Sequence, residues 1–269
     1  MKTALTIAGS DSGGGAGIQA DLKAFAANGV FGMSAITAIT AQNTVEVRSV
    51  QDIDIAIIKD QISAVFDDIN VDAVKIGMLS SAETVEAVAS ELERYQPEHV
   101  VLDPVMVSKG GHHLLKEQAV EALINKMLPL ATIITPNIPE AEVLANMVIQ
   151  TREDMEKACI KIGAMGVGAV LLKGGHLEGE PEDLFYDGEN FHWIPGKRIH
   201  TKNTHGTGCT LSSAIAANLA KGKSMLDAVR EAKKYILIAI ENSLSLGNGH
   251  GPTHHFYELY DKAGLTIKR

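Results

Sequence analysis

The sequence is poor in cysteine, in positive charge and in long apolar runs. Its two cysteines, Cys159 and Cys209, are too few for a disulfide framework and lack a metal-ligand spacing such as CxxC. Lys and Arg number 24 against 33 Asp and Glu, and the resulting net charge of −9, with no basic stripe, argues against binding of nucleic acid. No apolar run approaches the length of a membrane span, and Ala4–Ala8 is too short for a signal peptide. We therefore expect a soluble, cytoplasmic protein with no membrane or nucleic-acid partner.

The chain is rich in apolar segments of regular spacing. Hydrophobic residues make up 45% of the sequence and charged residues 21%, which is sufficient for a sizeable core. Short apolar runs typical of buried strands occur at residues 3–9, 33–40, 71–77, 99–106, 131–135 and 169–174. Longer runs typical of helices lie between them at residues 16–27, 53–69, 82–95, 116–128 and 152–165.

This alternation of strand and helix predicts a three-layer α/β fold, in which helices cover both faces of a mostly parallel central sheet. Residues 186–189, between two apolar runs, predict a hairpin, so antiparallel strands should complete the sheet. Two predicted helices start with residues that fit capping boxes, Ser80 with Glu83 and Thr151 with Asp154. No linker or internal repeat interrupts the pattern, so we expect a single domain over residues 1–269.

The segment Lys202–Thr210 is the most informative part of the chain. It places Gly206, Gly208 and hydroxyl residues around Cys209, directly before an Ala- and Leu-rich helical run at 211–221. Backbone N–H groups at a glycine-relieved turn that leads into a helix form a cradle for an anion. Because a helix N-terminus favours a thiolate, we expect the pKa of Cys209 to lie below the usual value of about 8.5. The cradle and the activatable group suggest transfer of an anionic group, most economically a phosphoryl group; a plain helix entry with an incidental cysteine is the alternative.

Glycine-rich or polar segments follow the first predicted strands, and ligands of open α/β sheets bind beyond the carboxyl ends of strands. The segment Gly9–Gly17 follows the first strand and is neither a Walker A loop nor a dinucleotide fingerprint. Its glycines would let a small planar ligand approach the backbone, although a bland turn before a helix would look the same. Gln42 follows the second strand with an amide that can donate and accept, and Met78 follows the third in an apolar wall. A loop cap and a core residue are the respective alternatives.

Carboxylates and a lysine follow the next three strands. Asp103 ends the fourth strand and Glu140 follows the fifth, where they could hold a hydrated Mg²⁺ against the phosphates of a nucleotide, or simply cap helices. Lys173 lies just inside the end of the sixth strand, where its partner would be an anionic phosphate or a structural carboxylate. We expect His176 and His205 to position other groups or to lie at the surface, rather than to carry protons.

In their order along the chain, these segments resemble the hydroxymethylpyrimidine/phosphomethylpyrimidine kinases of thiamine biosynthesis, which belong to the ribokinase-like superfamily. The resemblance is carried by Gly9–Ser12, Gly14–Lys23, Asn137–Glu140, Lys173–His176 and His205–Thr210. It runs from about residue 3 to residue 255, nearly the whole chain. It implies a ribokinase-like fold and an enzyme that uses ATP to phosphorylate 4-amino-5-hydroxymethyl-2-methylpyrimidine, and then converts the monophosphate to the diphosphate. It also implies Mg²⁺ as a cofactor and a homodimer.

The resemblance further implies roles for individual residues. The anion hole around the transferring phosphate would be formed by Gly206, Thr207, Gly208 and Cys209, and the charge of the ATP phosphates would be neutralised by Lys173. Mg²⁺ would be organised by Asn137 and Glu140, which match an Asn-x-x-Glu motif, with Asp103 nearby. The pyrimidine would lie among Gly9, Ala16, Asp21, Gln42, Met78 and Val105. Within that set, Gln42 and Asp21 would read the ring nitrogens and the amino group.

Three alternatives stay open at this point. Most sugar kinases of the superfamily carry an Asp base where this chain has Cys209, so the thiol as essential base is a hypothesis. Pyridoxal kinases of the same cysteine-containing subclass share almost every motif, but vitamin B6-specific relatives tend to carry Met where Gln42 stands, which favours the pyrimidine. A non-catalytic pyrimidine-binding protein on the same fold is the third alternative, and Glu140, Lys173 and the intact anion loop argue against it.

Overall fold

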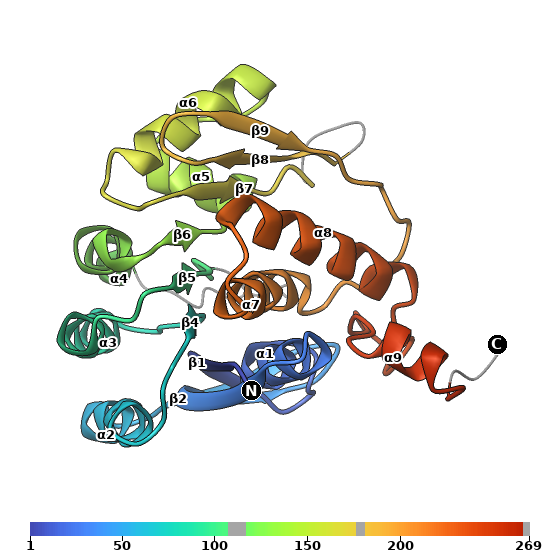
Figure 1. Ribbon diagram of the computed structural model, residues 1–269, viewed down its shortest axis with the longest axis horizontal. Helices are drawn as coiled ribbons and strands as arrows, with labels where there is room; N and C mark the ends of the chain where they lie inside the picture. The colour runs from blue at the N-terminus through green and yellow to red at the C-terminus, as the bar shows by residue number, and fades with distance from the viewer. Residues whose placement is uncertain (107–116, 176–180, 266–269) are drawn as a thin grey trace.

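The computed structural model of the chain describes residues 1–106, 117–175 and 181–265 (Figure 1). Its strands form one nine-stranded sheet in the order β3-β2-β1-β4-β5-β6-β7-β8-β9. They are β1 (Thr3–Asp11), β2 (Phe31–Gln42), β3 (Val47–Asp52), β4 (Ala73–Ile76), β5 (Val100–Leu102), β6 (Ile133–Ile134), β7 (Val170–Leu172), β8 (Asp183–Tyr186) and β9 (Phe191–Ile194). Parallel pairing joins the six central strands, β2, β1, β4, β5, β6 and β7, whereas β3, β8 and β9 pair antiparallel with their neighbours. The predicted, mostly parallel sheet with an antiparallel hairpin is confirmed.

Helices cover both faces of this sheet, as predicted (Figure 1). One face carries α2 (Ile55–Phe66), α3 (Ala82–Tyr95), α4 (Glu117–Ala122), α5 (Ile138–Ala145) and α6 (Arg152–Gly163). The other face carries α1 (Gly17–Ala27), α7 (Thr207–Ala220) and α8 (Met225–Glu241). A short helix, α9 (Tyr257–Lys262), lies near the end of α8.

Two apolar clusters, one on each side of the sheet, form the core. Leu5 and Ile7 of β1 belong to the cluster beneath α2–α6, whereas Ala4 belongs to the cluster beneath α1, α7 and α8. Because successive side chains of a strand point to opposite faces, β1 is buried on both sides. This burial explains why the first strand is a continuous apolar run in the sequence rather than an alternating one.

The helix starts agree with the predicted signals at one helix and differ at another. Thr151 and Asp154 form the predicted capping box at α6. At α3, however, the capping residue is Ser81, whose side chain accepts a hydrogen bond from the N–H of Thr84. The prediction for Ser80 was wrong by one position, and the Ser80 hydroxyl instead donates to a carboxylate of β3.

Several elements were mispredicted or missed. The helix predicted at 116–128 is α4 followed by a π-helical turn at Leu123–Met127 and a 3-10 turn at Leu128–Leu130 that contains a proline. The edge strand β3 was missed because its sequence, VRSVQD, is mostly polar and its side chains are mostly exposed. The helices α5 and α8 were also missed. Within the described part of the chain, no helix combines the length and the apolar character that a membrane span requires.

Candidate active site

The predicted site residues lie at one edge of the sheet, where the parallel strands end. Each follows or ends a different strand: Gly9 in β1, Gln42 in β2, Met78 after β4, Asp103 after β5, Glu140 after β6 and Lys173 after β7. The N-terminus of α7 reaches the same edge, because a Cβ at Gly208 would lie 3.5 Å from Asp103 Oδ2 and 3.6 Å from Lys173 Nζ. The carboxyl ends of parallel strands, together with a helix N-terminus, therefore converge as the ligand sites of open α/β sheets do.

The helix α7 begins at a glycine in the left-handed region. Gly206 is its N-cap with a φ of 77°, and a Cβ at this position would overlap the carbonyl oxygen of Gly15, so no other residue fits. The hydroxyl of Thr207 donates to a backbone carbonyl three residues earlier at 2.8 Å and holds the loop. In the part of the chain that the structure describes, no acceptor pairs with the backbone N–H of Gly208 or Cys209. These two amides, at the positive end of a helix, can receive an anion.

Lys173 and Asp103 form a charged pair beside this helix end. Lys173 Nζ lies 3.3 Å from Asp103 Oδ1, and the two side chains are 17% and 4% exposed. The hydroxyl of Thr135 donates to the same carboxylate at 3.2 Å, and the hydroxyl oxygen of Ser212 lies 3.4 Å from its other oxygen. Burial acts to lower the pKa of Lys173, but Asp103 and Glu140 outweigh it and raise this pKa, so the lysine is cationic. The structural ion pair foreseen as an alternative is present, and Lys173, whose side chain is not fully buried, could still receive a second anion.

Asn137 and Glu140 form a capping box at the start of α5. The Asn137 side chain accepts from the N–H of Glu140 at 2.9 Å, and Glu140 Oε2 accepts from the N–H of Asn137 at 2.8 Å. Burial raises the pKa of Glu140 to about 7, with Lys173 opposing the rise and Asp103 adding to it. Glu140 is thus part of a helix cap, which was the alternative to metal binding, and it is also a carboxyl group that a bound cation would ionise.

Among the described residues, no three His, Cys, Asp or Glu side chains gather into a cluster that would hold a metal ion by itself. Asp103 and Glu140 are two carboxyl groups that both interact with Lys173. Mg²⁺ keeps several water ligands and binds one or two carboxylates together with substrate phosphates. The residues present therefore fit a metal that arrives with a nucleotide, rather than a closed protein cage.

Cys209 lies in the first turn of α7, close to a buried ion pair. Lys75 Nζ is 2.9 Å from Asp21 Oδ1, and both side chains are fully buried. Burial raises the pKa of Cys209 to about 11; Lys75 and the backbone of Gly17 act to lower it, and Asp21 acts to raise it. The prediction of a lowered thiol pKa was therefore wrong, because desolvation outweighs the helix end and the nearby lysine. At neutral pH, Cys209 is a thiol.

Asp21, predicted to read the substrate ring, is surrounded by protein donors. The Thr6 hydroxyl donates to Oδ2 at 2.7 Å, the Ser213 hydroxyl donates to Oδ1 at 2.7 Å, and Lys75 donates as well. Because the side chain is 0% exposed, a direct bond from Asp21 to a substrate would require one of these donors to move. In the structure, Asp21 links β1 and β4 to the underside of α7.

The remaining candidate ring contacts surround the glycine-rich segment. Gly9 lies against Met78, since a Cβ at Gly9 would be 2.5 Å from Met78 Cε. Gly17, with a φ of 55°, packs its Cα on the carbonyl of Gly9, and the half-buried Ala16 caps α1 just before it. Val105 is also half-buried and donates its N–H to the carbonyl of Asp103. In the structure the end of the Met78 side chain occupies the space beside Gly9, so a flat ligand could approach the backbone here only if this flexible side chain moves.

Two groups at the site were missed or left undecided by sequence reasoning. Lys75 was not singled out within the predicted strand at residues 71–77, although a lysine within a buried strand is itself a signal of an internal ion pair. His205 was expected to be either a positioning or a surface group. It pairs with Asp11, Nε2 to Oδ2 at 2.8 Å, and its side chain is 12% exposed, which establishes it as an internal group. His176 lies outside the described residues.

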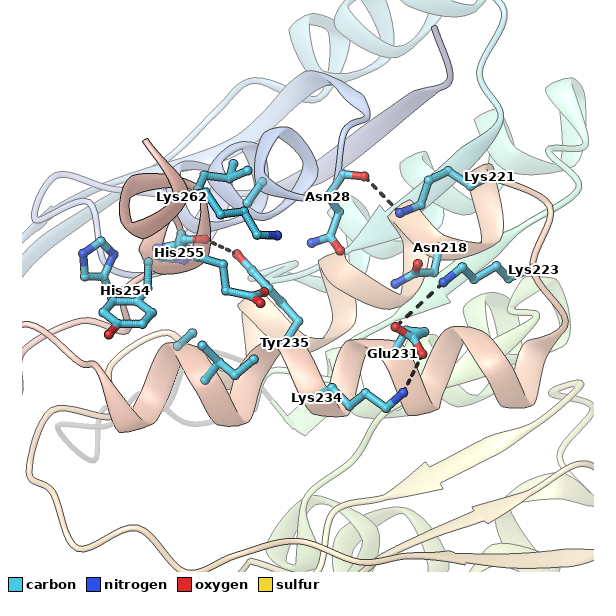
Figure 2. A pocket seen from close by; sticks show the side chains of 16 residues that line it. Asn28, Asn218, Lys221, Lys223, Glu231, Lys234, Tyr235, His254, His255 and Lys262 are labelled. Carbon is cyan, nitrogen blue, oxygen red and sulfur yellow. Dashed lines mark hydrogen bonds and ion pairs between the residues drawn. The ribbon is translucent and has the colours of Figure 1, made fainter. Parts of the chain in front are cut away.

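A cavity of about 320 Å³ lies at the opposite end of α7, bounded by the ends of α1 and α7, by α8 and by α9 (Figure 2). Three of its lysines already have partners. Lys221 Nζ donates to the carbonyl of Asn28 at 3.0 Å, and Lys223 and Lys234 pair with Glu231 at 4.0 and 2.8 Å. Because none of the predicted site residues lines this cavity, it is separate from the candidate active site.

Comparisons with known proteins agree with this geometry. The model of a family described as phosphomethylpyrimidine kinase matches residues 11–254. A hydroxymethylpyrimidine/phosphomethylpyrimidine kinase of Rhizobium meliloti (strain 1021) is 53% identical over 261 residues, which cover 96% of this chain and 98% of that protein. The crystal structure of a phosphomethylpyrimidine kinase from Clostridium difficile 630 matches with a TM-score of 0.80 and 50% identity, covering 88% of this chain and 98% of that one. The ADP complex of a pyridoxal kinase from Bacillus subtilis matches with a TM-score of 0.89 and 43% identity, covering 95% and 98%. The sheet and its helices are thus the expected ribokinase-like fold.

Proposed function

The chain belongs to the phosphomethylpyrimidine kinase family, and from this membership we infer that it phosphorylates 4-amino-5-hydroxymethyl-2-methylpyrimidine and then the monophosphate, in thiamine biosynthesis. The observation that carries this inference within the structure is the meeting of two half-sites at one sheet edge. One half is the α7 N-terminus with Lys173, which suits phosphates. The other half consists of Gly9, Met78 and Gln42 at the ends of β1, β4 and β2, which would suit a flat polar ring.

We propose that the anion hole and Lys173 supply most of the catalysis. In the reaction, the hydroxymethyl oxygen attacks the γ-phosphorus of ATP while the bond from that phosphorus to the bridging oxygen breaks, and ADP leaves with the bonding electrons. Such transfers depend mainly on positioning and on stabilisation of charge on the phosphoryl oxygens. The unpaired amides of Gly208 and Cys209, in the loop that Gly206 and Thr207 shape, are placed to bind those oxygens. Lys173 balances the charge that moves onto ADP.

Mg²⁺ is the cofactor that the donor set fits. Asp103 and Glu140 would hold it, directly or through water, with Asn137 fixing the start of α5 so that Glu140 keeps its place. When bound, the ion would neutralise phosphate charge and so favour departure of ADP. The same cation would drive ionisation of Glu140, whose pKa of about 7 leaves it partly protonated in the free chain.

Cys209 is the candidate acceptor of the hydroxyl proton. Only its thiolate accepts a proton, and with a thiol pKa of about 11 this form is scarce at neutral pH and becomes more abundant as the pH rises. We propose that this thiolate fraction accepts the proton as the oxygen attacks, so that the rate follows the abundance of the thiolate.

Gly9, Ala16, Met78 and Val105 would enclose the ring, with Gln42 bonding its polar edge and Asp21 acting through the neighbours that surround it. We also propose that the chain acts as one kinase domain over residues 1–269, as a homodimer in the cytoplasm. We base these proposals on the membership of the chain in this family.

Pyridoxal is the second candidate substrate, since the pyridoxal kinase from Bacillus subtilis shares the fold with a TM-score of 0.89. The test is Mg·ATP-dependent turnover of the hydroxymethylpyrimidine beside pyridoxal, with mono- and diphosphate products resolved by mass. Turnover of the pyrimidine through to the diphosphate supports the proposal. Turnover of pyridoxal alone would overturn it, and release of no ADP with either compound would point to a binding protein.

A further inference from the structure

A buried pair, Asp11 and His205, joins the glycine-rich segment to the anion loop. Asp11 Oδ2 lies 2.8 Å from His205 Nε2, and the two side chains are 3% and 12% exposed. His205 immediately precedes Gly206, the N-cap of α7, and its own N–H donates to the carbonyl of Gly251 at 3.1 Å. The pair therefore connects the start of α7 to the end of β1.

The state of Asp11 determines which atom of His205 carries a proton. Its carboxylate accepts from the N–H groups of Gly13 at 2.8 Å, Gly15 at 3.0 Å and Ala16 at 2.8 Å. Burial acts to raise the pKa of Asp11, but the hydrogen bonds from His205 and from the backbone outweigh it and hold this pKa below its usual value. An ionised carboxylate only accepts hydrogen bonds, so Nε2 of His205 is the protonated ring nitrogen and donates to it.

The same nitrogen faces the carboxamide of Gln42. Gln42 Nε2 and His205 Nε2 are 3.4 Å apart, and Gln42 Oε1 is 3.4 Å from the Thr40 hydroxyl oxygen. That hydroxyl, however, donates its single hydrogen to the carbonyl of Ser10 at 2.7 Å. In this orientation the amide N–H of Gln42 faces the N–H of His205, so a donor meets a donor. The amide oxygen faces the Thr40 hydroxyl, whose hydrogen is already donated, so an acceptor meets an acceptor. A half-turn of the carboxamide corrects both contacts at once, since its oxygen then shares the single hydrogen of His205 Nε2 with Asp11 and its nitrogen donates to Thr40.

We propose that His205, held by Asp11, is the positioning residue that fixes the orientation of the Gln42 carboxamide and so sets the ring selectivity of the site. With its oxygen sharing the His205 hydrogen with Asp11 and its nitrogen donating to Thr40, Gln42 presents one free N–H next to one free lone pair. An aminopyrimidine carries an amino donor next to a ring-nitrogen acceptor, and an amide pairs with such an edge through two hydrogen bonds. A ring without the amino group offers only half of that edge. This inference rests on the proposed function, because it takes the aminopyrimidine as substrate.

The test compares the aminopyrimidine with its des-amino analogue, 5-hydroxymethyl-2-methylpyrimidine, at saturating Mg·ATP. His205→Leu removes the donor, whereas His205→Gln keeps an N–H that can reach Asp11 and Gln42. His192→Leu is the matched control, because His192 also pairs through Nε2 with an aspartate but lies on β9, toward the far edge of the sheet. If Leu prevents folding, His205→Asn, with its shorter side chain, makes the same comparison. Calorimetric Kd values for both rings give the discrimination independently of turnover.

We expect His205→Leu to raise KM for the aminopyrimidine about tenfold, the cost of one misdirected hydrogen bond, with a smaller change in kcat. Its preference for the aminopyrimidine over the analogue should fall by a similar factor, and His205→Gln should restore much of it. A fall in kcat with unchanged discrimination would overturn the inference, as would equal impairment by Leu and Gln. A wild-type chain that leaves the aminopyrimidine unphosphorylated would overturn the proposed function separately. In that case the inference about His205 falls if His205→Leu leaves the ratio of the two Kd values unchanged.

Discussion

Replacement of Lys75 by methionine tests the electrostatics beneath the anion loop. Lys75 and Asp21 are both fully buried and lie 2.9 Å apart, so Lys75→Met leaves a carboxylate in the core with no cation. Breaking one side of a buried pair costs about 3–5 kcal/mol. At about 2 cal/mol/K of unfolding entropy per residue, this loss lowers the Tm of a chain of 269 residues by about 5–9 °C. Because Lys75 also lowers the pKa of Cys209, the variant thiol should titrate above its value of about 11.

The double variant Lys75→Met/Asp21→Asn removes both charges and should recover most of the lost stability. The hydroxyls of Thr6 and Ser213, which bond Asp21, can rotate to suit an amide. Urea unfolding gives the free energies, and the pH dependence of alkylation gives the thiol pKa. The matched control is Lys197→Met, which breaks an exposed pair with Glu241 and should cost less than about 1 kcal/mol. Equal stability of Lys75→Met and wild type, or a double variant no more stable than the single one, would refute the reasoning.

Three further changes probe the site. Glu140→Gln keeps the capping box but removes a carboxyl group whose pKa in the folded chain, about 7, exceeds its ordinary 4.5. The stability that Glu140 contributes is therefore complete below pH 4.5 and is lost as the pH rises through 7. In urea unfolding, the variant should gain more stability over wild type at about pH 8 than at about pH 5. Gly206→Ala places a Cβ on the carbonyl of Gly15 at positive φ, and we expect a loss of at least about 1–3 kcal/mol and of most turnover, measured by urea unfolding and ADP release. If Cys209 accepts the hydroxyl proton, kcat should rise as the pH approaches the thiol pKa of about 11. Cys209→Ala should then be about 100-fold slower and lack that rise. Near-normal turnover of this variant would exclude the thiol as base.

The order of strands and helices could be predicted because burial on both faces leaves a readable pattern. Strand β1 appears as a run of apolar residues, and the rule that ligands bind beyond strand ends pointed to Asp103, Glu140 and Lys173, whose side chains the structure brings together. The edge strand β3 could not be found in this way, since its exposed side chains carry no hydrophobic period. Local signals also fail by single positions, as Ser81 in place of Ser80 shows.

The electrostatics of the site depended on contacts that no local pattern contains. The helix end at Cys209 predicts a lowered thiol pKa, and only the packing of β1, β4 and α7 around it reveals the desolvation that reverses the sign. Likewise, the pairing of Asp11 with His205 joins residues far apart in the sequence, and neither has a nearby motif that names the other. Sequence patterns proposed candidate residues, but the charge states of these residues depend on their three-dimensional neighbours.

The first half of the chain builds one face of the sheet long before α7 and α8, which cover that face together with α1, have been synthesised. Ala73 and Val101 on that face pack against residues of α7 and α8, and α8 ends only at Glu241. At 5–20 residues per second, a ribosome would leave this apolar surface open for roughly 10–30 s after β4 emerges. Arrival of α7 and then of α8 ends the exposure, and the bond from Ser213 of α7 to Asp21 also completes the surroundings of the buried Lys75–Asp21 pair beneath the anion loop. Protection of the nascent sheet and assembly of the candidate active site therefore begin with one and the same step in the synthesis of this kinase, the arrival of α7.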